Sequence, residues 1–165
     1  MHLWQRVVAL AAASVLFAST QFPVWAQADP SEPEPVPVIV TLTTDKVYYR
    51  PGEPVIVTMT VRNIGSDPVT LRFNSSQRYD FFARQVPSGQ VVWQWSFGKY
   101  FLWVLGAETL LPGETRVLTE EWKQQTNSNA QVPTGIYRLD GVVTCSTPAA
   151  ISSNPAFIQI GRRLF

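Results

Sequence analysis

Residues 73–101 read FNSSQRYDFFARQVPSGQVVWQWSFGKYF, which is a polar run followed by two apolar runs around a Pro-Ser-Gly turn. The apolar runs, Phe81–Val86 and Val91–Phe97, flank residues 87–89, and this arrangement is typical of a β-hairpin. Bulky rings favour burial, whereas the polar run Asn74–Tyr79 favours a loop. The stretch therefore predicts a polar loop that is held against a hydrophobic hairpin.

The same alternation of apolar and polar residues continues on both sides of this hairpin. β-Branched residues at every second position indicate half-buried strands, and Gly- and Pro-rich segments separate them. No segment has a sustained apolar spacing of three and four residues, so we expect no helix. The predicted strands are 38–43, 55–62, 69–73, 81–86, 91–97, 117–122, 136–144 and 156–160.

About eight short strands at roughly ten-residue spacing predict an all-β fold, an Ig-like antiparallel β-sandwich. Trp93, Trp95 and Phe97 share one face of their strand, and we expect them in the core between the sheets. The alternative places one tryptophan at a binding surface, and Trp95 is the better candidate because it lies nearer the strand end. The run Tyr100–Leu105 is apolar on both faces, so it is either a strand that is buried on both faces or a strand with an exposed apolar face.

The first residues have the pattern of a secretory signal peptide. Val7–Phe17 is an apolar run of about eleven residues, which is too short to span a bilayer, and the small residues Ala26 and Ala28 predict cleavage after Ala28. Cleavage after Ala26 and an uncleaved membrane anchor are the alternatives. The predicted organisation is a signal peptide (1–28), a Pro/acid-rich linker (29–37) and one β-sandwich domain (38–165). We therefore expect a secreted or periplasmic protein of the cell envelope, without stable membrane insertion after cleavage.

Cleavage would limit the chemistry of the mature chain. His2 is the only histidine and would leave with the signal, which excludes Ser-His-Asp and Cys-His catalysis and the usual zinc sites. We therefore expect no enzyme, no catalytic residue, no metal and no cofactor. Loss of Arg6 would leave 13 − 1 = 12 Lys and Arg against 12 Asp and Glu, so the net charge of the mature chain would be zero. The Lys and Arg residues form no cluster in the sequence, so we expect no nucleic-acid partner. Cys145 is the single cysteine, and we expect it to be a small buried residue.

Side chains of the polar run and of the hairpin end are the candidates for contact with a partner. Arg78 either pairs with Asp80 or another carboxylate and fixes the loop, or it protrudes and enters a pocket of a partner protein. The long polar stretch Lys123–Thr134 is either a mobile connection or a recognition loop. The candidate partner-binding residues are Ser75, Ser76, Gln77, Arg78, Tyr79, Asp80, Trp95, Lys99 and Tyr100.

These motifs resemble the intracellular proteinase inhibitor family, the BsuPI domain. The resemblance rests mainly on SSQRYDF at residues 75–81 and VWQWS at 92–96, with the weaker pieces LPGE at 111–114 and PTGIY at 133–137. It covers roughly residues 36–160. The resemblance implies a compact β-sandwich that binds a serine protease.

Two functions remain open at this point. The resemblance implies a non-covalent serine protease inhibitor that occludes the active site of its target. The alternative is an exported, non-inhibitory protein-interaction module of the cell envelope, which the export signal and the linker favour. In both cases the partner is a protein, and we expect the chain to be a monomer.

Overall fold

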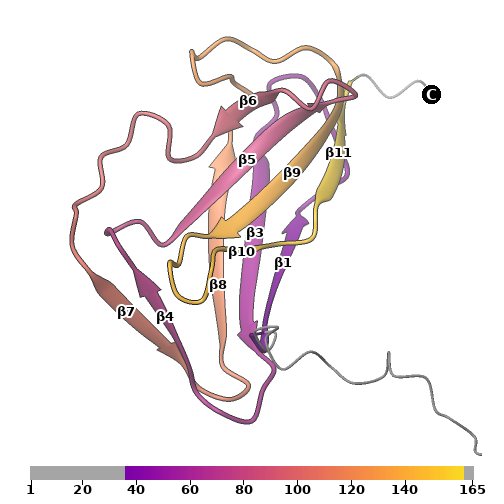
Figure 1. The fold of residues 1–165 in the computed structure, drawn as a ribbon. Helices are drawn as coiled ribbons and strands as arrows, with labels where there is room; N and C mark the ends of the chain where they lie inside the picture. The colour runs from indigo at the N-terminus through magenta and orange to yellow at the C-terminus, as the bar shows by residue number, and fades with distance from the viewer. Residues whose placement is uncertain (1–35, 162–165) are drawn as a thin grey trace, which may run out of the picture. The chain divides into compact units, whose positions relative to one another are not determined.

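The computed structural model describes residues 36–161, which form three β-sheets and no α-helix within that range (Figure 1). The predicted signal peptide, residues 1–28, and all but the last two residues of the predicted linker lie outside the described residues. Within residues 36–161, no helix has the length and apolar character needed to cross a bilayer.

The first sheet has three antiparallel strands in the order β1-β3-β8. Its central strand β3 alternates between buried and partly exposed residues along its whole length, because every second side chain points toward the other sheet. The strands are β1 (Val38–Thr44), β3 (Val55–Asn63) and β8 (Thr115–Trp122).

The second sheet has the order β2-β11-β9-β5-β6, and β10 pairs with β9 beside this path. All its pairs are antiparallel except β11 with β2, which run parallel. The strands are β2 (Tyr48–Tyr49), β5 (Tyr79–Val86), β6 (Val91–Gln94), β9 (Gly135–Val143), β10 (Ile151–Ser152) and β11 (Ala156–Ile160).

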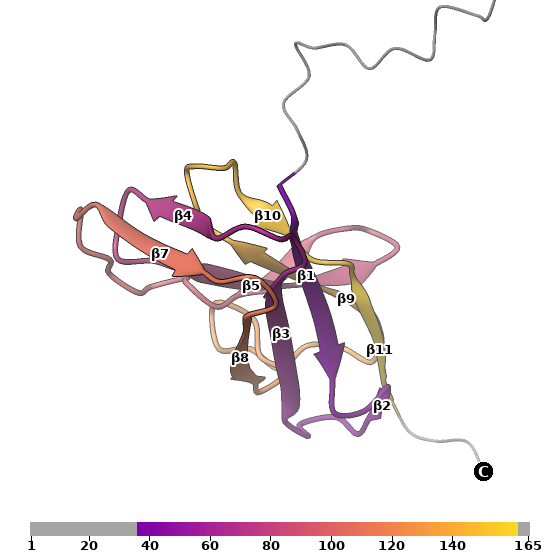
Figure 2. The ribbon, with the colours of Figure 1, turned by 90° about the horizontal axis from the view of Figure 1, so that it is seen from below.

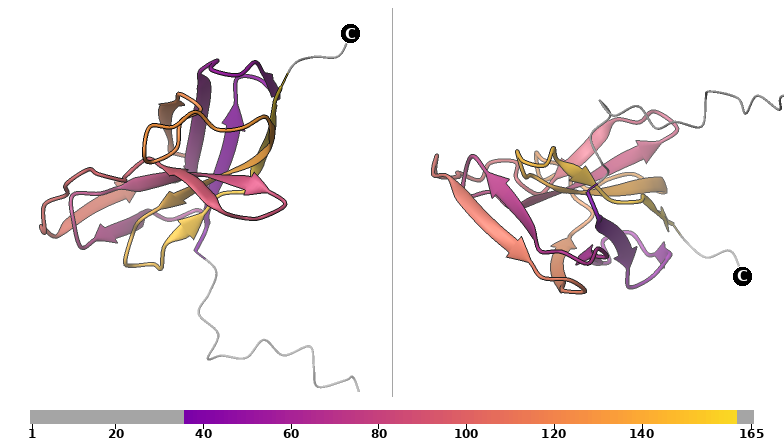
Figure 3. Two further views of the ribbon diagram at one scale, coloured as in Figure 1. Left: turned by 90° about the horizontal axis from the view of Figure 1, so that it is seen from above. Right: turned by 60° about the horizontal axis from the view of Figure 1, so that its bottom comes forward.

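The third sheet is a separate antiparallel pair, β4 (Val69–Phe73) with β7 (Gly106–Leu110) (Figure 3). It extends from one end of the molecule, away from β1 and β11 (Figure 2). The chain reaches β7 from β6 by a long connection without strand structure, residues 95–105.

The core lies between the first two sheets and also includes Leu71, Phe73 and Leu110 of the third sheet. Trp122 of β8 is fully buried, stacks on Trp93 with ring centroids 5.9 Å apart and meets Tyr137 edge-on at 5.5 Å. The sheets approach closely at Gly141 of β9, where an added Cβ would lie 2.7 Å from the sulfur of Met59. Two sheets packed through such a core confirm the predicted Ig-like β-sandwich.

The strand list differs from the prediction in its details. Residues 36–161 contain eleven strands where about eight were expected, and two of them, β2 and β10, have only two residues. β7 was not predicted, because its sequence GAETL has little apolar alternation and only Leu110 is buried. The run Tyr100–Leu105 is not a strand, and most of its side chains are exposed, so burial on both faces is wrong and the exposure of apolar side chains is correct.

Candidate protein-binding surface

Arg78 is half-buried and is held in place by several partners. Its Nε donates to Glu108 Oε1 at 2.7 Å, its Nη1 donates to the carbonyl of Ser75 at 2.7 Å, and the guanidinium lies 4.5 Å from the centroid of the Phe73 ring. Glu108, on β7, also accepts from Arg116 at 2.6 Å. Arg78 therefore pairs with a carboxylate, as one alternative required, but the carboxylate belongs to Glu108 and not to Asp80.

The close approach of Arg78 to β7 depends on a glycine. A Cβ on Gly106 would overlap Nη2 of Arg78, so only a residue without a side chain fits there while the guanidinium keeps its bonds. Gly106 opens β7 opposite Phe73 of β4. The third sheet and the polar run are thus joined at one point.

Asp80 is buried and fixes the end of the hairpin. Its carboxylate accepts from the backbone N–H groups of Phe81 at 2.9 Å and Ser96 at 3.0 Å. It also accepts from the Gln94 amide and the Ser96 hydroxyl, both at 2.6 Å. Four hydrogen bonds occupy this carboxylate internally, so it supports the surface without facing a partner.

Ser76 connects the polar run to the connection between β6 and β7. Its N–H donates to the carbonyl of Leu102 at 2.9 Å, and its hydroxyl accepts from the Leu102 N–H at 2.9 Å. The neighbouring side chains bond within the run: Ser75 Oγ accepts from the Gln77 N–H at 3.2 Å, and the Gln77 amide donates to the Tyr79 carbonyl at 3.2 Å.

Tyr79 of β5 and Trp95, the first residue of this connection, form an aromatic layer. Their ring centroids lie 4.5 Å apart, Lys99 Nζ lies 3.3 Å from the Trp95 ring, and Phe101 packs against Trp95 at 6.1 Å. The Tyr79 hydroxyl donates to Glu120 at 2.7 Å. Burial, with a smaller contribution from this hydrogen bond, raises the pKa of Tyr79 to about 12.

Above this layer lies an exposed stretch that we call the apolar segment, residues 100–105. Tyr100 is fully exposed, Trp103 is 90% exposed and Leu105 is 85% exposed, while Phe101 is half-buried against Trp95. The segment belongs to the connection between β6 and β7, which Figure 1 shows along one side of the molecule. Only Tyr100 of this segment was among the predicted site residues. The signal for the others was the run of apolar residues on both faces.

The three aromatic residues expected to fill the core differ in their surroundings. Trp93 is half-buried and packs on Trp122, Trp95 is half-buried under Lys99, and Phe97 is 60% exposed. The Trp95 Nε1 is buried without a hydrogen-bond partner among the described residues. Trp93 and Trp95 therefore both pack against the core from half-buried positions, and the core placement is wrong for Phe97.

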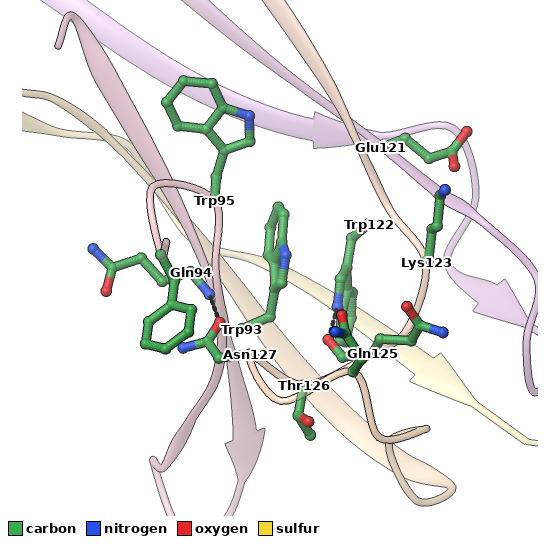
Figure 4. A pocket seen from close by; sticks show the side chains of 11 residues that line it. Trp93, Gln94, Trp95, Glu121, Trp122, Lys123, Gln125, Thr126 and Asn127 are labelled. Atoms are coloured by element: carbon green, nitrogen blue, oxygen red, sulfur yellow. Dashed lines mark hydrogen bonds between the residues drawn. The ribbon is translucent and has the colours of Figure 1, made fainter. Parts of the chain in front are cut away.

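A shallow pocket of about 200 Å³ lies between β6 and the stretch 123–129 (Figure 4). Its walls are held by internal bonds: the Gln94 N–H donates to Asn127 at 2.9 Å, and the Trp122 indole donates to the Gln125 carbonyl at 2.8 Å. The predicted long loop is anchored at its start, because the buried amide of Gln124 bonds the backbone of residues 50–53. Among residues 36–161, no three His, Cys, Asp or Glu side chains cluster so as to hold a metal ion.

Comparison with known proteins gives a family. The model of the family described as "Intracellular proteinase inhibitor" (BsuPI) matches residues 42–147, which confirms the resemblance carried by the sequence motifs. No curated protein matches the chain. The family favours a binding protein over an enzyme, and a proteinase as the kind of protein partner.

Solved structures resemble the chain at low identity. They include an alkylpurine DNA glycosylase from Pseudomonas fluorescens bound to DNA (TM-score 0.47, 12% identity, 77% of this chain and 31% of that one). A second is a β-glucosidase from Erythrobacter marinus (TM-score 0.46, 12% identity, 75% of this chain and 15% of that one). A third is the CARDB domain of a Pyrococcus furiosus protein in complex with di-metal ions (TM-score 0.42, 15% identity, 74% of this chain and 91% of that one). The chain thus spans less than a third of the length of the first two.

The family also corrects the predicted location. A secreted or periplasmic protein was expected from the apolar run at residues 7–17, which lies outside the described residues. The family is described as intracellular, which points to the cytoplasm, so the prediction of export is wrong. A short apolar run followed by small residues is a compositional signal, and composition alone does not establish that a segment is recognised for export. The alternative of an exported module of the cell envelope loses its basis with this correction.

Proposed function

We propose that this chain, which belongs to the BsuPI family of intracellular proteinase inhibitors, is a non-covalent inhibitor of a serine protease. The observation that carries the proposal is the family match over residues 42–147. This range begins within β1 and ends after β9, so it includes most of both sheets of the sandwich and the connection that bears the apolar segment.

The chemistry of the chain supports a non-covalent mode of binding. The single thiol, that of Cys145, is buried, and its Sγ lies 3.4 Å from the carbonyl oxygen of Ala149. Burial raises the pKa of this thiol, which keeps it protonated at neutral pH. A buried, protonated thiol does not react with a protease, so inhibition would depend on surface complementarity.

The architecture around the polar run supports tight binding. Arg78, Asp80 and Ser76 fix the run, the hairpin end and the apolar segment to one another before any partner arrives. A surface that is ordered in the free protein loses little conformational entropy when it docks. In this proposal Lys99 and Tyr100 face the protease, while Ser75, Ser76, Gln77, Arg78, Tyr79, Asp80 and Trp95 support the contact surface.

A titration of full-length protein against a panel of proteases tests this proposal. The panel contains trypsin, chymotrypsin and subtilisin, with one cysteine protease and one metalloprotease as controls for class. We expect loss of activity of at least one serine protease, with activity recovered after rapid dilution. No loss of serine protease activity at micromolar protein would overturn the proposal.

Intact-mass measurement of the inhibited mixture tests the non-covalent mode separately. We expect the two masses of the free proteins under denaturing conditions. A summed mass, which would indicate a covalent adduct, would contradict that part of the proposal.

A further inference from the structure

We propose that the apolar segment enters the substrate cleft of a serine protease whose primary specificity pocket is apolar, and that Trp103 fills this pocket. The inference rests on the proposed function and adds to it the residue that makes the central contact and the class of protease. It concerns four residues that were not among the predicted partner-binding residues, Leu102, Trp103, Val104 and Leu105.

The first support is the concentration of exposed apolar side chains. Of the fifteen large hydrophobic side chains that are exposed within residues 36–161, six lie between Phe97 and Leu105. Contiguous exposed apolar surface is unusual on a soluble protein and marks an interaction site. Tryptophan is also among the residues that most often dominate the binding energy of an interface.

The second support is the way in which Trp103 is presented. The Val104 N–H donates to the Leu102 carbonyl at 2.9 Å, which closes a three-residue turn with Trp103 at its apex. Leu102 is held by its two hydrogen bonds to Ser76, so the turn is fixed at its base. The N–H and C=O groups of Trp103 have no hydrogen bond within the described part of the chain, and they remain available to the backbone groups of a protease cleft.

The third support is charge, which selects the class of protease. Trypsin-type pockets contain a carboxylate and require a cation, whereas chymotrypsin-type pockets are apolar slots. The guanidinium of Arg78, which lies beside Gly106, is occupied by Glu108 and the Ser75 carbonyl, and Lys99 precedes the turn that presents Trp103 and lies over the Trp95 ring. The side chains that project from the segment itself are uncharged.

The experiment measures inhibition constants of the full chain and three variants against chymotrypsin, subtilisin and trypsin. We expect the unchanged chain to inhibit chymotrypsin or subtilisin. Trp103→Ala should raise the inhibition constant at least about 30-fold, the size of a hot-spot residue. Phe157→Ala is the matched control, because Phe157 is also an exposed aromatic residue (53%) but lies on β11, and its inhibition constant should not change.

Trp103→Arg tests the pocket directly, because a cation at this position should weaken inhibition of chymotrypsin and create inhibition of trypsin. Thermal unfolding midpoints of all variants should match that of the unchanged chain, since Trp103 is exposed. Equal inhibition by the unchanged chain and Trp103→Ala, or inhibition of trypsin alone by the unchanged chain, would overturn this inference and leave the proposed function intact. Absence of inhibition of every serine protease would overturn both.

Discussion

Trp122 and Trp103 are the same residue type in opposite surroundings. Trp122 ends β8 opposite Val55 of β3, and this pairing directs its ring into the core between Trp93 and Tyr137. Trp103 lies in a connection that pairs with no strand, and its ring is exposed. The comparison teaches that apolar composition alone does not bury a side chain. Burial requires a backbone position that faces the opposite sheet, and an apolar residue without such a position is available to a partner.

Substitution of the two tryptophans should give the largest difference. Trp122→Ala should lower the free energy of unfolding by about 3–5 kcal/mol, because it leaves a cavity in the core. Trp103→Ala should change it by less than about 0.5 kcal/mol, because it removes only exposed surface. Urea denaturation followed by far-ultraviolet circular dichroism measures the free energy of unfolding of both variants. Equal losses in the two variants would show that Trp103 is packed in the core in solution.

Substitution at Gly106 should have an intermediate effect on the free energy of unfolding, because this residue follows the apolar segment and begins the strand β7. Gly106→Ala would displace the guanidinium of Arg78 from Glu108 and the Ser75 carbonyl, and we expect a loss of about 1–3 kcal/mol in the free energy of unfolding. The same variant should weaken inhibition, since the polar run that holds Leu102 would shift.

Gly161→Ala is the matched control for this variant, because an added Cβ there meets no atom within 4 Å. Its urea midpoint should equal that of the unchanged chain. A Gly106→Ala midpoint as high as that of the control would show that Arg78 can move without cost and does not support the apolar segment.

The smallest effect at neutral pH should come from the hydroxyl of Tyr79. Its pKa is raised from 10.0 to about 12, so folding favours the protonated form. The stabilisation is complete below pH 10 and is lost as the pH rises from 10 to 12. Tyr79→Phe should therefore reduce the fall in stability across this range, measured by urea denaturation at several pH values.

Tyr49 provides an internal comparison for this measurement. Its pKa is likewise raised to about 12, by burial and by the hydrogen bond to Asp45, so Tyr49→Phe should reduce the alkaline loss in the same way. An unchanged alkaline profile in Tyr79→Phe would show that Tyr79 is not held under the apolar segment in solution.

The sequence predicts the sandwich well because its signal is local. In β3 the alternation of apolar residues is directly reflected in the alternation of buried positions. β7 could not be found in this way, since its residues form a strand through pairing with β4 and not through their own pattern. The partner of Arg78 could not be predicted for the same reason. Glu108 is thirty residues away in the sequence, and the pairing of β7 with β4, which was not predicted, brings it to Arg78.

The assignment of residues 75–80 to a contact surface stays a prediction. Most of their polar atoms bond inside the molecule, and motifs do not distinguish supporting residues from contact residues. The exposure of Trp103 depends on the absence of a strand partner, which is a property of the complete fold.

The attachment of the chain on both sides of Trp103 bears on what happens if a protease cuts there. Leu102 is bonded to Ser76 on one side, and Gly106 pairs with Phe73 on the other. A cut after Trp103 would leave both new ends fastened to the same body, with the freed amine close to the acyl group. Proximity of this kind corresponds to effective molarities of about 10⁵–10⁸ M. Re-formation of the peptide bond after Trp103 would then compete with hydrolysis of the acyl-enzyme. The cleaved chain would stay bound to the protease and would not dissociate as a product.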